Sequence, residues 1–231
     1  VHGKTGLGSI AVFDAKRSLE NKNATDFIID TLMRAKDNST CVITTGPLTN
    51  VASAIRKKGQ IKAKISEIVM MGGAMKEAGN ITPSAEYNIF ADPHSADLIF
   101  KSGLTINVLG LDVTHQATGT TSLIKRLDAL NSKVGSTVVE MIGCLANHDN
   151  IRHQKTGPPL HDACTVAFVL KRDLFEYKKC YLETETRSSL TMGHTSVDFW
   201  NVLANEPNVN WVHSVNKKGF EDLVFDQIKK Y

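Results

Sequence analysis

Cysteine is scarce in this sequence, and no two cysteines have the C-x-x-C spacing of a zinc or redox motif. The four that occur are Cys41, Cys144, Cys164 and Cys180. Their spacing argues against a zinc site, and we interpret them as buried thiols of a protein in a reducing compartment. The corresponding expectation is a cytoplasmic protein.

The sequence also lacks a strong charge of either sign. Lys and Arg number 27 and Asp and Glu number 24, which gives a formal net charge of +3 over 231 residues. This small, scattered excess gives no basis for binding nucleic acid or an anionic membrane. No apolar run is long enough to span a bilayer, and the first residues lack the basic and apolar regions of a secretory signal. We therefore expect neither nucleic acid nor a membrane as a partner.

Internal repeats, low-complexity tracts and linkers are absent as well, so we predict a single domain over residues 1–231. The chain begins at Val1 without an initiating Met, and glycines follow at once. We interpret it as an N-terminally truncated or processed chain.

The sequence does contain a regular alternation of short apolar runs and helical patterns. Strands are predicted over 41–44, 65–71 and 104–110, with a β-rich region over 179–215. Helices are predicted over 25–36, 47–58, 92–103, 121–131, 134–148, 161–171 and 217–230. In the first helix, Phe27, Ile28, Leu32 and Met33 are expected to share one face. The alternation predicts an α/β fold with a mostly parallel sheet flanked by helices.

The most informative segment runs from Gly79 to Asn88. Its Gly and Pro content predicts a loop between elements rather than a helix. Asn80, Glu86 and Asn88 place a carboxylate and two amides within nine positions. Such a set suits a polyol, because each hydroxyl needs a donor and an acceptor. The alternative is a solvated loop, and the nearby Asp92 is interpreted mainly as a helix cap.

A second signal is the run Pro158-Pro159-Leu160-His161-Asp162, in which a rigid double proline leads into an apolar helix. In the simpler interpretation, Asp162 caps that helix and His161 is half buried. In the functional interpretation, Asp162 is an oxygen ligand suited to Ca²⁺ or Mg²⁺, and His161 is a general acid.

Polar residues follow three of the predicted strands. They are Thr44-Thr45, the 79–88 segment and Asp112-Val113-Thr114-His115. In open α/β sheets, ligands bind beyond the carboxyl ends of the strands, so these segments are expected to meet there. A backbone carbonyl of the Thr44-Thr45 segment could complete the ligand set of a metal ion.

These residues resemble, in order and spacing, the inosine-uridine-type nucleoside hydrolases, also called nucleoside N-ribohydrolases. The resemblance covers the chain from end to end. The motifs that carry it are His2-Gly3-x-x-Gly6-Leu7-Gly8, Thr45-Gly46-Pro47-Leu48-Thr49-Asn50, Met71-Gly72-Gly73, Gly79-Asn80, Ala85-Glu86-Tyr87-Asn88, Asp92-Pro93, Pro159-Leu160-His161-Asp162 and Thr191-x-Gly193-x-Thr195-x-x-Asp198.

The resemblance implies a Rossmann-like α/β domain that hydrolyses the N-glycosidic bond of ribonucleosides with the help of one Ca²⁺. It also implies a homodimer or homotetramer. The roles that it implies are metal binding by Asp162 and the backbone carbonyl of Thr45, and ribose binding by Asn80, Glu86, Asn88 and Asp162. It further implies contact with the ribose by Met71, a place near the base for His2, a place beside the nucleoside for Tyr87, and proton donation to the leaving base by His161.

One family feature does not occur in this sequence. Relatives carry a D-x-D-x-x-x-D-D loop after the first strand, which supplies calcium ligands, a ribose contact and the base that activates water. The leading α/β units that would carry it are missing, Thr5 stands where an Asp is usual, and the implied Ca²⁺ site is incomplete in this chain. The alternative hypotheses are a non-catalytic nucleoside- or ribose-binding relative and a hydrolase of another ribosyl compound.

Overall fold

The computed structural model describes residue 10 and residues 17–148 and 157–231, and the fold is described for these residues. Within them, every helix is too short or too polar to cross a lipid bilayer.

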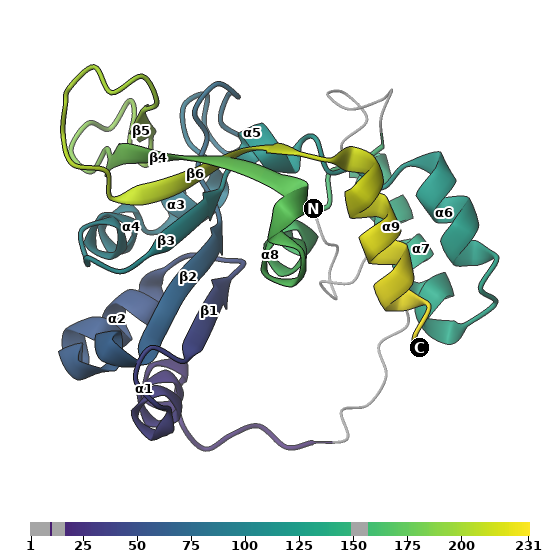
Figure 1. Ribbon diagram of the computed structural model, residues 1–231, viewed down its shortest axis with the longest axis horizontal. Coiled ribbons are helices and arrows are strands. Elements are labelled where there is room, and N and C mark those ends of the chain that lie inside the picture. The colour runs from purple at the N-terminus through teal and green to yellow at the C-terminus, as the bar shows by residue number, and fades with distance from the viewer. Residues whose placement is uncertain (1–9, 11–16, 149–156) are drawn as a thin grey trace.

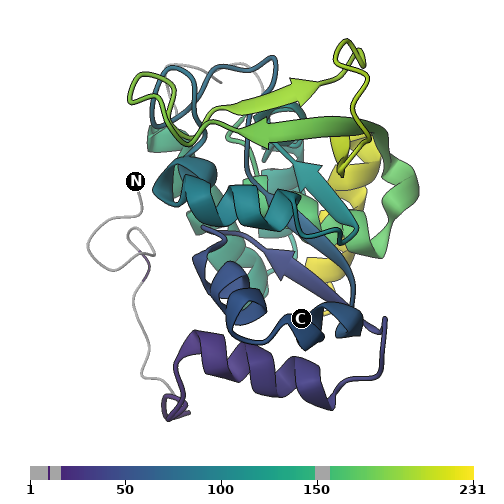
Figure 2. The ribbon, with the colours of Figure 1, turned by 90° about the vertical axis from the view of Figure 1, so that its left-hand side faces the viewer.

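The described strands form one six-stranded sheet in the order β1-β2-β3-β6-β4-β5. The strands are β1 (Thr40–Thr44), β2 (Ile65–Met71), β3 (Ile106–Leu109), β4 (Phe175–Thr184), β5 (Thr195–Asp198) and β6 (Val209–Val215). The first four in this order run parallel, whereas β4 is antiparallel to both β6 and β5. The sheet extends from β1 to the β4–β5 pair at its opposite end (Figure 2). The carboxyl ends of β1, β2 and β3 therefore lie along one edge.

Helices cover both faces of this sheet (Figure 1). The helices are α1 (Ala24–Arg34), α2 (Thr49–Lys57), α3 (Tyr87–Ala91), α4 (Pro93–Phe100), α5 (Leu111–Thr114), α6 (Thr121–Asp128), α7 (Lys133–His148), α8 (His161–Leu170) and α9 (Lys217–Ile228). Two 3₁₀ turns, η1 (Gly59–Lys64) and η2 (Arg172–Leu174), precede β2 and β4.

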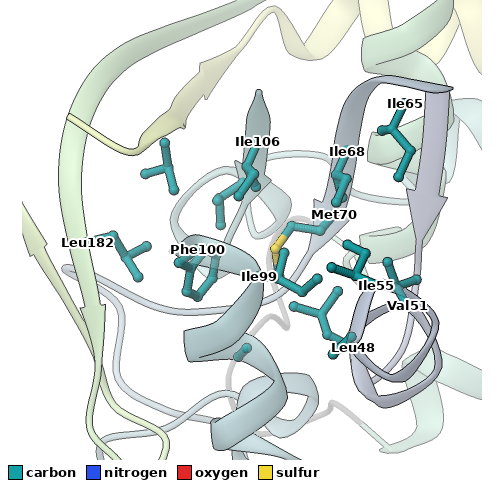
Figure 3. Close-up of a cluster of buried hydrophobic side chains, with 14 of the residues drawn as sticks. Leu48, Val51, Ile55, Ile65, Ile68, Met70, Ile99, Phe100, Ile106 and Leu182 are labelled. Atoms are coloured by element: carbon teal, nitrogen blue, oxygen red, sulfur yellow. The ribbon is translucent and has the colours of Figure 1, made fainter. Parts of the chain in front are cut away.

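The first face is packed by α1, α2 and α4. The side chains of Ile68 and Met70 on β2 and of Ile106 on β3 point into this layer, where Leu48 and Phe100 meet them (Figure 3). All five are nearly inaccessible to solvent. A buried side chain of this size stabilises the fold by about 1.5–3 kcal/mol, so this layer holds the strands in register.

The second face is packed by α8, with α5 and α9 beside it. Alternate residues of the same strands, Val69 and Leu109, point to this side and meet Phe168 of α8. A satellite cluster joins α6, α7 and α9 through Leu123 and Ile142. Because successive side chains of a strand point to opposite faces, the same short strands build both layers.

The predicted fold class is confirmed, and the predicted strands and helices lie close to the observed ones. Two expectations were wrong. On α1, Leu32 is buried, but Phe27 and Met33 are 47% and 39% exposed, so the apolar face is narrower than expected. The 79–88 segment also does not end as a loop, because α3 begins at Tyr87. Its one turn is too short to show a helical period, and the Glu86 side chain caps it.

Candidate functional site

The loop after β2 starts with two glycines in a confined space. Gly73 has φ +86°, and a β-carbon there would press on the Thr195 side chain at 3.2 Å. Its carbonyl accepts a hydrogen bond from Leu111 N at 2.8 Å, which ties the ends of β2 and β3 together. Glycine is required here because a side chain is strained at positive φ.

Glu86 is a buried carboxylate, with an exposed fraction of 2%. Its Oε2 accepts hydrogen bonds from the backbone N–H groups of Asn88 at 2.9 Å, Gly73 at 3.1 Å and Ile89 at 3.4 Å. Among the described residues, Oε1 has no hydrogen-bond partner. One oxygen is therefore fixed by the backbone, and the other remains an acceptor for a ligand.

Burial destabilises the negative charge of Glu86. Burial raises the pKa of this carboxyl, and the N–H groups of Asn88, Gly73 and Ile89 oppose the rise. The negative charge of Asp162 raises the same pKa further, so the two carboxylates lie close enough to repel each other. A ligand that carries hydroxyl donors or positive charge would relieve this repulsion.

Asn88 is nearly buried and is oriented by Met71 at the end of β2. Its Nδ2 donates to the Met71 carbonyl oxygen at 3.1 Å and lies 3.3 Å from Met71 Sδ. Because a carbonyl can only accept, this contact settles which end of the amide is nitrogen. Asn88 Oδ1 has no partner within the described part of the chain and is a second acceptor beside Glu86.

Asn80 lies in a tight loop whose start only glycine can occupy. A β-carbon at Gly79 would come within 2.2 Å of the Thr82 carbonyl oxygen and 2.4 Å of Ala85 N. Asn80 Oδ1 accepts from Tyr87 N at 2.8 Å, which leaves its Nδ2 as a donor without a partner among the described residues. This segment thus presents one donor and two acceptors, as a polyol requires.

His194 and Thr195, from the motif over residues 191–198, contact the loop between β2 and α3. Thr195 Oγ1 accepts from Ala74 N at 2.9 Å and donates to the Ala74 carbonyl at 2.7 Å. His194 Nδ1 is 3.0 Å from the Ser84 carbonyl. We therefore assign these two residues to shaping the loop rather than to contacting a ligand.

His161 is the first residue of α8 and is half buried. Its Nδ1 lies 2.7 Å from Thr114 Oγ1 of α5. The His115 ring meets the His161 ring edge to face, with centroids 5.7 Å apart and planes at 60°. His115 Nδ1 in turn lies 3.1 Å from Glu77 Oε2. The imidazole is therefore contacted by a hydroxyl and by a second imidazole.

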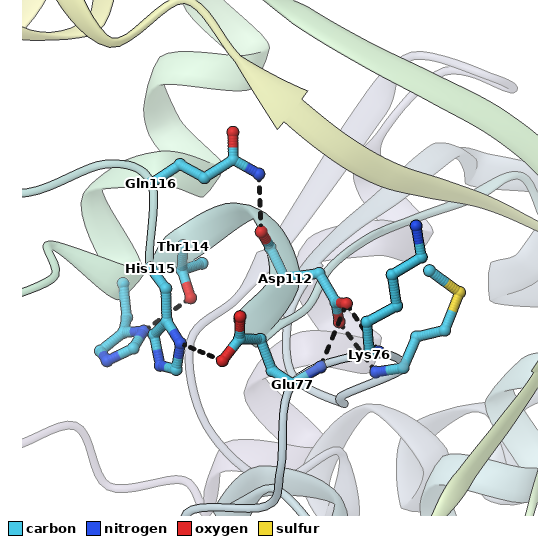
Figure 4. Close-up of polar contacts among 8 residues, drawn as sticks. Lys76, Glu77, Asp112, Thr114, His115 and Gln116 are labelled. Atoms are coloured by element: carbon cyan, nitrogen blue, oxygen red, sulfur yellow. Dashed lines mark hydrogen bonds and ion pairs between the residues drawn. The ribbon is translucent and has the colours of Figure 1, made fainter. Parts of the chain in front are cut away.

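Asp112 holds the loop that carries Glu77 (Figure 4). Its carboxylate accepts from Lys76 N at 2.7 Å, Met75 N at 2.8 Å and Glu77 N at 3.4 Å. The Asp112 carbonyl accepts from Gln116 Nε2 at 2.7 Å. The sequence placed residues 112–115 at this edge without a role, and Glu77 was missed because only the folded loop brings it to His115.

The structure brings most of the predicted residues together. Glu86, Asn88 and Met71 are in contact, and Asp162 acts on Glu86 electrostatically across 76 positions of sequence. Thr45 follows β1 at the same edge of the sheet and is exposed, as are Asp162 and the Tyr87 side chain, the last at 53%. His2 lies outside the described residues.

Over residues 17–148 and 157–231, no group of three or more His, Cys, Asp or Glu side chains is arranged to hold a metal ion. A polar cavity of about 500 Å³ lies between α4, the end of β4 and the start of β5. Asp97, Lys101 and Arg187 are among the residues that line it, and no predicted site residue does.

Comparison with known proteins gives one consistent result. The profile of the inosine-uridine preferring nucleoside hydrolase family matches residues 1–222. The pyrimidine-specific ribonucleoside hydrolase RihA of a Shewanella species is 38% identical over the whole chain, which covers 72% of that protein. An uncharacterised protein of Schizosaccharomyces pombe is 36% identical over 99% of the chain and 74% of its own length.

Solved structures agree with the sequence matches. A purine-preferring ribonucleoside hydrolase from Gardnerella vaginalis superposes with a TM-score of 0.89 at 30% identity and covers 99% of this chain and 72% of its own. A plant nucleoside hydrolase superposes with a TM-score of 0.90 at 26% identity over all of this chain and 74% of its own.

Proposed function

This chain belongs to the inosine-uridine preferring nucleoside hydrolase family, and from that premise we propose that it hydrolyses the N-glycosidic bond of ribonucleosides to ribose and a free base. The observation that carries the proposal is the state of Glu86. Glu86 is a buried carboxylate with one oxygen fixed by three N–H groups and the other without a hydrogen-bond partner among the residues that the structure describes, so it is prepared for a hydroxyl group of a ligand.

The reaction builds positive charge on the sugar, because cleavage passes through an oxocarbenium-like transition state. The neighbouring charges of Glu86 and Asp162 stabilise that state more than the neutral substrate. Ribose is the sugar partner that we assign to Asn80, Glu86, Asn88 and Asp162, with Met71 against the ring. Tyr87 and His2 are assigned to the nucleoside end that carries the base.

We assign His161 as the general acid. The C–N bond of the nucleoside breaks with its electron pair moving to the base nitrogen, which is a poor leaving group unless it is protonated. A half-buried imidazole at the start of α8, fixed at Nδ1 by Thr114, is suited to that transfer. General acid catalysis of this kind contributes about 10²–10⁴-fold.

Calcium is the metal that we propose, with Asp162 and the Thr45 carbonyl among its ligands. Both are hard oxygen donors, and the buried Thr44 hydroxyl beside Thr45 has no hydrogen-bond partner in the described part of the chain. These donors fit calcium in kind and supply part of the roughly 6–8 oxygens that it takes. Bound calcium would lower the pKa of a coordinated water and orient it.

The relatives leave the base open, so the substrate class that we propose is ribonucleosides in general. RihA is pyrimidine-specific by name, whereas the Gardnerella vaginalis enzyme is purine-preferring by name. Pyrimidine nucleosides are the first substrates to test, because the identity to RihA is the higher of the two.

The direct test is release of ribose from uridine, cytidine, inosine and adenosine with calcium supplied, measured as reducing sugar. Hydrolysis of at least one nucleoside supports the proposal. No turnover on the whole panel contradicts it. Calorimetric binding of ribose without hydrolysis would instead favour a non-catalytic relative. Product analysis with nicotinamide riboside tests the third hypothesis, which is hydrolysis of another ribosyl compound.

Three further assignments are proposals. A homodimer or homotetramer rests on the family resemblance, residence in the cytoplasm on the cysteine pattern, and a single domain over residues 1–231 on the lack of repeats and linkers. Sedimentation analysis of the purified protein tests the first of them.

A further inference from the structure

Thr114 is a fully buried residue that lies against the proposed general acid. Its side chain is 0% exposed, and its Oγ1 lies 2.7 Å from His161 Nδ1. No other hydrogen bond is made by this hydroxyl within the described residues. α5, which carries Thr114, begins directly after Gly110 at the end of β3. The hydroxyl is therefore held by the sheet and faces one ring nitrogen.

The Thr114 hydroxyl can accept a hydrogen bond from Nδ1–H of the His161 ring. Nδ1 carries a proton both in the imidazolium and in the neutral ring that remains once Nε2 has lost its proton. Thr114 Oγ1 can therefore accept from Nδ1–H before and after the transfer. This contact also leaves Nε2 as the nitrogen that gives up the proton.

The second contact of the ring limits its rotation. The His115 ring meets the His161 ring at a centroid distance of 5.7 Å, and Glu77 holds His115 through Nδ1 at 3.1 Å. The Glu77 backbone N–H in turn donates to the Asp112 carboxylate at 3.4 Å. The imidazole is therefore contacted by Thr114, the last residue of α5, and by His115, the next residue, and Glu77 in the 75–77 loop supports His115.

We propose that Thr114 is a positioning residue for leaving-group protonation, which holds His161 so that Nε2 delivers the proton to the departing base. The inference rests on the proposed function. In this step, the Nε2–H bond of the imidazolium breaks and a base N–H bond forms, while the C–N electron pair moves to the base nitrogen. The ring is left neutral with its proton on Nδ1, donated to Thr114 Oγ1.

The test compares two leaving groups in Thr114→Val, which keeps the shape of the side chain and removes the hydroxyl. We expect kcat on uridine or inosine to fall about tenfold, the equivalent of one lost hydrogen bond. KM should change little. The kcat on p-nitrophenyl riboside should fall less than about twofold, because p-nitrophenolate leaves without a proton. Thr114→Ser should restore most of the loss.

Thr184→Val is the matched control. It also removes a buried threonine hydroxyl, one that has no hydrogen-bond partner in the described chain and lies at the end of β4. Both substrates should be hydrolysed at the wild-type rate. An equal loss on both substrates in Thr114→Val, or no rescue by Thr114→Ser, would overturn the inference while leaving the proposed function intact.

A measurement that needs no turnover completes the test. In spectra that correlate ring protons with ring nitrogens, the His161 Nδ1 resonance, assigned with His161→Ala, should move in Thr114→Val and return in Thr114→Ser. An unmoved resonance contradicts the contact. A wild-type protein that hydrolyses neither nucleosides nor p-nitrophenyl riboside contradicts the proposed function, and this inference with it.

Discussion

The two walls of the candidate site are built in different ways. The sugar wall, residues 71–73 and 79–89, holds a buried carboxylate mainly with backbone N–H groups that lie near it in sequence. The base wall consists of residues 111–116 with His161 and Asp162. Its imidazoles are held by side chains that are distant in sequence: Thr114 is 47 positions from His161, and Glu77 is 38 positions from His115. The N–H groups of the sugar wall are already ordered by α3 and the end of β2. The base wall depends on side chains that must in addition be ordered one against another.

This difference predicts that substitutions in the two walls have different signatures. Changes to charge between the walls should abolish catalysis for every substrate. A change at His161 in the base wall should depend on the leaving group, loss of the Asp112 carboxylate in the same wall should lower stability, and a change at Glu86 in the sugar wall should depend on pH.

The largest effect is expected for Asp162→Ala, which removes the charge shared by the two walls. Activity should fall at least roughly 10³-fold on all substrates, because an electrostatic contact to the transition state is lost. Calcium binding, measured by calorimetry, should weaken in parallel. Asp128→Ala, which removes an exposed carboxylate at the end of α6, is the control and should leave both unchanged. Full activity of Asp162→Ala would show that the walls do not share this residue.

His161→Ala should separate the base wall from the sugar wall. Hydrolysis of inosine or uridine should fall about 10²–10⁴-fold, whereas p-nitrophenyl riboside should lose far less. Parallel assays of the two substrates measure the ratio. If the activated substrate suffers as much as inosine, His161 does not protonate the leaving group.

Asp112→Ala is expected to lower the stability of the protein more than its catalytic rate. Three backbone N–H groups lose a charged acceptor, which we expect to lower the free energy of unfolding by about 2–3 kcal/mol. Urea unfolding monitored by fluorescence measures this change. Asp112→Asn keeps one acceptor oxygen and should cost less. Equal stability of Asp112→Ala and the wild type would mean that the 75–77 loop needs no such support.

The smallest effect is expected for Glu86→Gln on the pH dependence of stability. Because burial raises the folded-state pKa of Glu86 above its ordinary value of 4.5, the wild type binds this proton more tightly when folded. Its free energy of unfolding should therefore fall, relative to Glu86→Gln, as the pH rises from below 4.5 through the raised pKa. Unfolding of both proteins in a chelator across this range measures the difference. A constant difference would show that Glu86 is not strained by its charge.

Much of the fold and half of the site follow from local patterns. The strand over 65–71 and the Asp92 cap of α4 are where the sequence predicts them. Asn80, Glu86 and Asn88 were found because they lie within nine positions, and the polar ends of the first three strands were found because parallel strands end at one edge. Such features show in short stretches of sequence, because an apolar run indicates a strand and a capping residue bonds the backbone within one turn.

The sequence by itself determined which chemical groups are available: two carboxylates, two amides and an imidazole, each in a loop or near the start of a helix. Only the tertiary structure decided how they are used. Over the described ranges, it left Oε1 of Glu86 without a hydrogen-bond partner, placed Asp162 near that carboxylate, and set Thr114 and His115 around His161. These contacts join segments that meet only when β2, β3 and α8 pack together, and the packing of buried side chains, not any local preference, sets that geometry.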